Sequence, residues 1–187
     1  IVALVTGSVN AQQVIKAKIG IKIITEKTSF PARSEETIKL TDRISIYVIP
    51  ENNYHVNVIY SDLVDKPRLI TIDVKKGEPW ILPSENTFFQ PDGSSDQGYF
   101  TVICSQGELP EVRSFFSSEG KNHTQWSQLE NDLVQKSNRI ILQTSPKPPS
   151  LGGVQRGLQR PVWSTKNLPT LSAEPYLIKR YKFNFEK

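Results

Sequence analysis

The sequence predicts a mainly β protein: an antiparallel β-sandwich, immunoglobulin-like or related, with one covering α-helix near 124–138. Apolar and polar residues alternate in several short runs, which is the period of strands with one buried face. Clusters of Pro, Gly, Asn and Ser separate these runs, as is typical of sandwiches. Only 124–138 repeats its apolar residues at the three- and four-residue spacing of a helix.

The composition agrees with a single globular domain. The chain has 187 residues, of which 37% are apolar and 22% charged. That length is enough for one sizeable core, and these proportions exclude a disordered chain, a coiled coil and a multi-span membrane protein. With one Cys and two His, the sequence excludes an intramolecular disulfide framework and leaves little for a His-based metal site.

Residues 1–11 are expected to be the remnant of a signal peptide. The chain opens on an uncharged apolar run, and Val9 and Ala11 have the small side chains that signal peptidase accepts before a cut. The alternative is a buried strand that ends at Gly7-Ser8. A leader predicts export to a periplasm, an outer surface or the medium, and 12–187 then form one β-sandwich domain.

Eight strands are expected in that domain. In the first, lysines alternate with aliphatic residues, a pattern typical of a half-solvated strand and of protection at a sheet edge. In the last, Tyr181, Phe183 and Phe185 alternate with polar residues and predict a buried aromatic face. The expected strands are 16–24, 44–49, 54–60, 68–72, 80–82, 99–104, 112–116 and 176–185.

The predicted helix has one apolar face. Trp126, Leu129 and Leu133 recur along it at helical spacing, and Thr124 is expected to be its N-cap. Acidic residues lie in its earlier half and basic residues near its end, as the helix dipole favours. We expect the apolar face to cover one end or edge of the sandwich.

The stretch 143–175 is expected to be an irregular arm, because its Pro and Gly residues favour an extended or loose chain. From 133 to 187 there are ten basic residues against two acidic ones, a net charge of +8. Such a segment favours acidic partners, and the tryptophan within it can contact a sugar or a peptide. The alternative is that the cations are solvated and the tryptophan packs on the sheet. The candidate partner contact is Arg156, Arg160, Trp163 and Lys166.

No residue is assigned as catalytic, cofactor-binding or metal-binding. The nucleophile-elbow, phosphate-loop, dinucleotide-binding and zinc-protease motifs are absent from the sequence. A cysteine nucleophile would need Cys104 beside His55 or His123, yet Cys104 lies in an apolar strand that suits a core residue better than a thiolate. The loop 92–96 has two carboxylates that suit calcium, but its spacing favours a solvated hairpin loop.

The stretch 42–116 resembles the bacterial domain-of-unknown-function 4384 family, found in exported proteins and beside caspase-like peptidase modules. Strand 54–60 is followed by a second strand, then by a turn glycine and an apolar strand that ends in Pro83. A polar loop at Asp92-Gly93 then leads to the hydrophobic strand that ends in Ser105. The chain departs from the family pattern where 71–74 replaces a Pro-Asn turn and where Gln97-Gly98 lacks an acidic residue. The resemblance implies a β-sandwich accessory domain without catalytic residues.

These observations predict a non-catalytic, exported binding or accessory domain. Its expected partner is a protein or an anionic envelope polymer, contacted by strand addition at a sheet edge or through the basic arm. No cofactor, nucleic acid or membrane span is expected. The alternatives are a hydrolase of an unfamiliar type, using Cys104 with a histidine or an acid pair, and a structural subunit whose C-terminal strand pairs with a neighbour.

Overall fold

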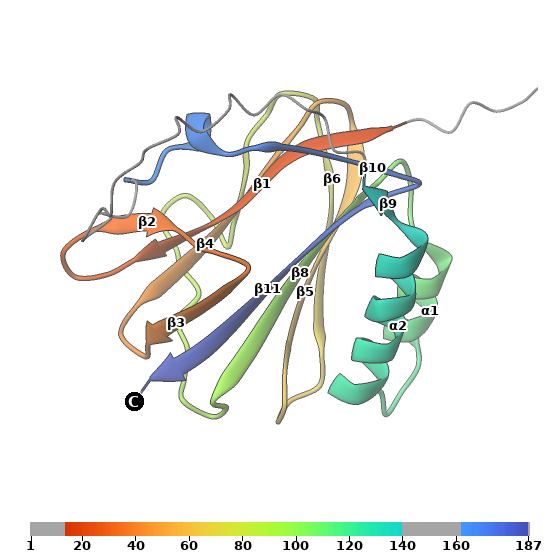
Figure 1. The fold of residues 1–187 in the computed structure, drawn as a ribbon. Helices are drawn as coiled ribbons and strands as arrows, with labels where there is room; N and C mark the ends of the chain where they lie inside the picture. The colour runs from red at the N-terminus through yellow and green to blue at the C-terminus, as the bar shows by residue number, and fades with distance from the viewer. Residues whose placement is uncertain (1–13, 140–161, 187) are drawn as a thin grey trace, which may run out of the picture.

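The computed structural model describes residues 14–139 and 162–186, and these ranges form three layers (Figure 1). Two β-sheets pack face to face, and two helices cover the outer face of one of them. The predicted mainly β class and sandwich are therefore confirmed. The expected leader at 1–11 lies outside the described residues.

Sheet A has six strands and forms one outer layer of the described structure. Its order is β7-β4-β1-β10-β9, and β2 pairs with β1 beside this path. All of its pairs are antiparallel. The strands are β1 (Ile15–Ile24), β2 (Ser29–Pro31), β4 (Arg43–Pro50), β7 (Trp80–Leu82), β9 (Asn138–Arg139) and β10 (Thr170–Glu174).

Sheet B has five strands and forms the middle layer. Its order is β3-β11-β8-β5-β6, and only the pair of β3 with β11 is parallel. The strands are β3 (Glu35–Lys39), β5 (Tyr54–Asp62), β6 (Arg68–Val74), β8 (Gln97–Ser105) and β11 (Leu177–Glu186).

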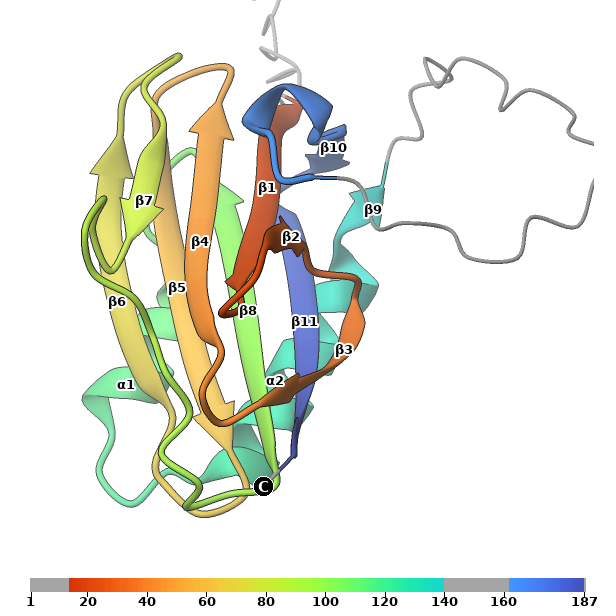
Figure 2. The same cartoon turned by 90° about the vertical axis from the view of Figure 1, so that its left-hand side faces the viewer.

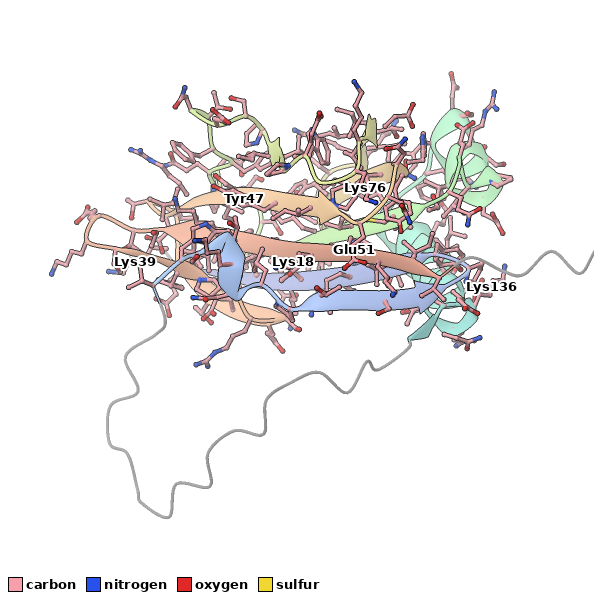
Figure 3. The ribbon with its side chains drawn as sticks, turned by 90° about the horizontal axis from the view of Figure 1, so that it is seen from above. Lys18, Lys39, Tyr47, Glu51, Lys76 and Lys136 are labelled. Carbon is pink, nitrogen blue, oxygen red and sulfur yellow. The ribbon has the colours of Figure 1, made fainter. Side chains whose placement is uncertain are left out.

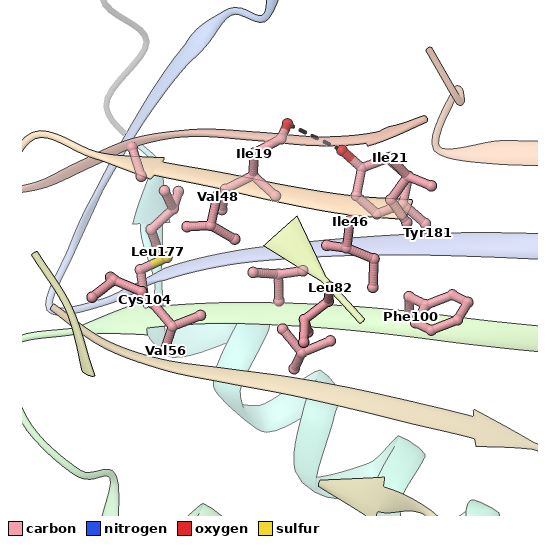
Figure 4. Close-up of a cluster of buried hydrophobic side chains, with 14 of the residues drawn as sticks. Ile19, Ile21, Ile46, Val48, Val56, Leu82, Phe100, Cys104, Leu177 and Tyr181 are labelled. Carbon is pink, nitrogen blue, oxygen red and sulfur yellow. Dashed lines mark hydrogen bonds between the residues drawn. The ribbon is translucent and has the colours of Figure 1, made fainter. Parts of the chain in front are cut away.

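The main core fills the space between the two sheets (Figure 4). Ile19, Ile21, Ile46 and Val48 of sheet A face the inward side chains of sheet B, since alternate residues of each strand point to one face. The hydroxyl of Tyr181 donates a hydrogen bond to the carbonyl of Ile19 at 3.2 Å and ties the sheets together inside the core. The predicted buried aromatic face of the last strand is confirmed for Tyr181 and Phe183, while Phe185 is half-buried.

The segment 112–116 is helical, so its prediction as a strand is wrong. It lies in α1 (Pro110–Ser117), which begins with Pro110 at its first turn and buries Val112 and Phe115. These two side chains are three residues apart, which places them on one face of a helix. Proline suits the first helical turn because its missing N–H needs no partner there.

The second helix, α2 (His123–Lys136), confirms the predicted helix but begins differently. Its N-cap is Asn122, whose side chain accepts a hydrogen bond from the backbone of Gln125 while the Gln125 side chain accepts one from Asn122. Thr124 is therefore not the cap. With α1, the helix covers the outer face of sheet B rather than an end or edge, because Trp126 and Leu133 pack on Ile103.

Strand β1 is an interior strand, so the expected edge position of its lysines is wrong. It lies between β4 and β10, and its lysines point to the outer face of sheet A. Gly20 leaves a gap on that face, and Leu168 packs directly over it.

The expected irregular arm is only partly irregular. Residues 143–161 lie outside the described residues, while 162–175 contain the short 3-10 helix η1 (Thr165–Asn167) and strand β10. Strand β10 was not predicted because only Leu171 and Ala173 of its five residues face the core, which leaves a very short alternating pattern. No helix in 14–139 or 162–186 is long and apolar enough to cross a membrane.

Candidate functional site: an open sheet edge beside an acidic pocket

Strand β6 ends sheet B and pairs on one side only, with β5 (Figure 2). It is seven residues long, whereas the other terminal strands of the two sheets, β3, β7 and β9, have five, three and two residues. The free side of an edge strand offers unpaired backbone N–H and C=O groups to another chain. Strand β6 is therefore the longest terminal edge in the described structure.

The middle of β6 lacks the features that protect natural edges. Proteins place lysine, proline or a bulge on an exposed edge to prevent pairing. The residues 69–72 are instead Leu-Ile-Thr-Ile, a run with high strand propensity and no charge. Ile70 is 38% exposed, and Leu63 and Val64 in the adjoining hairpin turn are 59% and 63% exposed.

A cavity of about 180 Å³ opens between the two sheets beside this edge. Strand β7 stops at Leu82, so that beyond Ile46 the side of β4 that faces away from β1 pairs only through the bridge of Ile44 to Phe89. Two backbone hydrogen bonds of 2.8 and 2.9 Å hold that bridge. The apolar part of the wall is formed by Ile44, Val58, Tyr60, Ile70, Phe89, Phe100 and Phe185.

The aromatic rings of this wall pack on one another. The ring of Phe100 lies 5.1 Å from that of Tyr60 and 5.4 Å from that of Phe89, measured between centroids. Burial raises the pKa of Tyr60, and the nearby carboxylate of Asp62 raises it further. The Tyr60 hydroxyl therefore stays protonated at neutral pH and serves as part of a neutral wall.

The rim of the cavity is acidic. Asp62 is buried and accepts hydrogen bonds from the backbone of Val64 and Asp65 at 2.9 and 2.6 Å. Asp65 pairs with Arg68 at 2.7 Å, and Ser94 donates two hydrogen bonds to Asp92 that lower its pKa. Three carboxylates and one guanidinium leave the rim with a net charge of −2.

The predicted partner contact lies on another surface and is described in part. Trp163 packs on Tyr47 of β4 with 4.7 Å between ring centroids, and its backbone N–H donates to Ser29 at 3.2 Å. Lys166 is exposed in η1. Both lie over the outer face of sheet A, where Figure 3 shows Lys18 and Tyr47. Arg156 and Arg160 lie outside the described residues.

The structure does not bring Cys104 together with either histidine. Cys104 pairs with Val56 and points into the core between the sheets, whereas His55 pairs with Ser105 and points to the opposite face of sheet B. His123 lies on that opposite face too, 5.2 Å from Tyr99 between ring centroids. Burial raises the pKa of the Cys104 thiol to about 12, so the group is a core side chain and not a thiolate.

The loop 92–96, which was considered for calcium, is held by hydrogen bonds from Ser94 and Phe185. The side chain of Asp92 is engaged by Ser94, and the backbone carbonyl of Asp96 accepts a hydrogen bond from Phe185 at 2.9 Å. Within 14–139 and 162–186, no group of three His, Cys, Asp or Glu residues is placed to hold a metal ion.

Sequence reasoning found the strand 68–72 but not its position at an edge, and it did not find the pocket.

Comparison with family models, curated proteins and solved structures gives no match for this chain. The function is therefore inferred from the geometry and chemistry of the site.

Proposed function

We propose that this chain is a non-catalytic binding domain that recognises an extended segment of another protein by strand addition at β6. The observation that carries the proposal is the open, seven-residue edge of β6 with an uncharged centre. Main-chain hydrogen bonds to such an edge supply affinity, and pockets for alternate side chains supply specificity.

The pocket lies where an added strand would use it. Arg68 and Ile70 pair with Tyr60 and Val58, which places all four side chains on the inner face of sheet B. A strand laid along the free side of β6 points every second side chain to the same face. Those side chains lie beside the mouth of the cavity. The backbone of β6 therefore supplies affinity, and the cavity supplies specificity.

Two sequence predictions fit this role. A leader at 1–11 would place the domain outside the cytoplasm, and the resemblance to the domain-of-unknown-function family suggests an accessory module. The hydrolase alternative has less support, because Cys104 and the two histidines lie on opposite faces of sheet B. The structural-subunit alternative has less support, because β8 pairs with β11 on one side and β3 pairs with Lys182–Glu186 on the other.

Strand addition is tested by selecting peptides from a random nine-residue library on the full chain. Backbone amide hydrogen exchange is then compared with and without a selected peptide. We expect slower exchange in 68–74 and no change in the other terminal strand of sheet B, β3. Selected peptides that bind without slowing exchange in β6 would overturn the proposal.

A matched pair of variants checks the edge itself. Thr71→Lys places a charge on β6 outside the cavity, whereas Thr37→Lys places the same charge on β3; both positions are exposed. We expect the first variant to weaken binding of the selected peptide at least about tenfold, because a lysine on an edge opposes pairing. The second variant should leave binding unchanged, and equal effects of the two would contradict the assignment to β6.

An anionic envelope polymer is a second candidate partner, favoured by the outer face of sheet A. Lys16, Lys18 and Lys22 share that face with the Trp163–Tyr47 pair, and none of the three pairs with a carboxylate of the described residues within 4.0 Å. Lysines beside an aromatic pair suit a negatively charged sugar chain.

This second candidate is tested by retention on a polyuronate column under a salt gradient. Replacing Lys16, Lys18 and Lys22 by Gln should lower the eluting salt concentration more than replacing the exposed Lys27, Lys66 and Lys75, which carry the same total charge. Equal shifts would show only non-specific attraction to a basic protein and would reject this surface.

A further inference from the structure

The pocket beside β6 has the size and the charge to select particular side chains of an added strand. Resting on the proposed strand addition, we infer that the favoured segment carries one large apolar side chain and, two positions nearer the β5–β6 hairpin, a basic side chain. The first enters the aromatic cavity and the second meets the acidic rim.

The spacing follows from the register of the sheet. Ile70 and Arg68 are successive inward-facing residues of β6, and Arg68 is the one nearer the hairpin turn. Residues of an added strand opposite these two positions also point inward and are two apart in sequence. One inward side chain therefore lies beside Ile70 and the cavity, and the next lies beside Arg68 and the rim.

The cavity suits a ring or a branched aliphatic group. A cavity of roughly 150 Å³ lined by apolar side chains accepts benzene, and this one measures about 180 Å³. Its wall offers Phe89, Phe100 and Tyr60, whose rings form tilted contacts with one another. A further ring can join such a cluster with an offset geometry and gain both burial and ring contact.

The rim favours a cation over an anion. The charge of Arg68 is engaged by Asp65 at 2.7 Å, so it does not repel an incoming basic group as a free guanidinium would. Asp62 and Asp92 are held by amide and hydroxyl donors and have no cationic side chain within 4.0 Å among the described residues. An acidic side chain placed here would meet a net charge of −2, and like-charge contacts across an interface are unfavourable.

The inference is tested with synthetic nine-residue peptides of Thr and Val that carry Phe at the centre and Arg two positions away. Both orders, Phe before Arg and Arg before Phe, are made, because an added strand can run in either direction. Each has two controls, in which Arg is replaced by Glu or Phe by Ser. Fluorescence anisotropy gives the affinity of each labelled peptide for the full chain.

In the better-binding order, replacing Arg by Glu or Phe by Ser should each weaken affinity at least about tenfold. The variant Asp92→Asn should reduce the preference for Arg over Glu at least about threefold, and added salt should reduce it too. Asp132→Asn, which removes an exposed carboxylate on α2, is the matched control and should leave the preference unchanged.

Different results would contradict the side-chain preference and the strand addition on which it rests. Equal affinities for the Arg and Glu peptides, or for the Phe and Ser peptides, with β6 amides still protected, would overturn the side-chain preference and leave strand addition standing. Binding of the Phe–Arg peptide that leaves β6 exchange unchanged would overturn both. Sedimentation of the chain alone reports whether a second copy occupies the edge, and a stable dimer that blocks peptide binding would also overturn the inference.

Discussion

Gly98 shows how one residue without a side chain shapes the pocket. A Cβ added at this position would lie 2.7 Å from Cζ of Phe185 and 3.1 Å from Cε2 of Tyr60, and both rings line the cavity. Such distances are shorter than ordinary van der Waals contact, so at least one ring would have to move. Glycine at 98 therefore permits the two rings to close over β8.

We expect Gly98→Ala to lower the free energy of unfolding by about 1–3 kcal/mol, which is typical of overpacking a core. Urea unfolding followed by circular dichroism measures the change. Gly107→Ala is the control, because nothing lies within 4 Å of the added Cβ; it should change the value by less than about 0.5 kcal/mol. Equal effects would show that the rings do not constrain position 98.

Cys104 is the residue on which the hydrolase alternative depends. Its pKa, raised by burial from 9.0 to about 12, lowers the thiolate population roughly a thousandfold at neutral pH. A disulfide reagent should therefore leave folded Cys104 unmodified at pH 7.5 and modify it rapidly in urea. Fast labelling of the folded protein would reopen the enzymatic alternative.

At the scale of elements, a buried ionisable group joins α2 to sheet B. Glu130 of α2 accepts a hydrogen bond from Thr101 of β8 and pairs with Arg180 of β11 at 3.1 Å. The guanidinium of Arg180 also lies 4.8 Å from the ring centroid of Tyr99. Burial raises the pKa of Glu130, while Thr101 and Arg180 oppose this effect without cancelling it.

The raised pKa gives the wild-type protein a pH-dependent stability. Between pH 4.5 and the folded-state pKa, folded Glu130 binds more protons than unfolded Glu130. The free energy of unfolding therefore falls with rising pH in this range. The stabilising contribution of Glu130 is fully present below pH 4.5 and is lost as pH rises through the folded-state pKa. The variant Glu130→Gln does not titrate. Its free energy of unfolding should therefore increase relative to wild type as pH rises.

Urea unfolding from pH 4 to pH 8 measures this difference. Asp132→Asn on the exposed face of the same helix is the control, and its difference from wild type should not show the same rise. A free energy of unfolding of Glu130→Gln that falls relative to that of wild type with increasing pH would contradict the assigned direction.

At the scale of the whole molecule, sheet B links the two hydrophobic clusters. Its inner face contributes to the core between the sheets, and its outer face contributes Ile59, Ile103 and Ile178 to the cluster beneath the helices. If sheet B unfolds, the apolar side chains of both clusters are exposed to water. The three layers should therefore unfold in one cooperative transition.

A variant that keeps only Trp126, with Trp80 and Trp163 replaced by Phe, tests this expectation. Trp126 is buried beneath the helices and reports on the second cluster alone. Its fluorescence and the far-ultraviolet circular dichroism of the sheets should give the same urea midpoint. An earlier fluorescence transition would show that the helical layer detaches first.

The alternation of apolar and polar residues determined the strand class of this protein without further information. Strands such as β5 and β11 could be predicted because apolar residues alternate along them and indicate which face is buried. The capped amphipathic helix α2 was predictable for the same reason. Where the local pattern was weak or ambiguous, as in α1 and β10, the prediction was wrong or missing.

Only the tertiary structure decided which strand lies at an edge and where a cavity opens. The lysines of β1 suggested an edge, yet β1 is interior, while β6, whose centre is uncharged, ends its sheet. Strand order depends on pairings between distant segments, such as β1 with β10, and a local period carries no information about them. The pocket depends on the early end of β7, on five other strands and on two loops, so it exists only once these segments pack together.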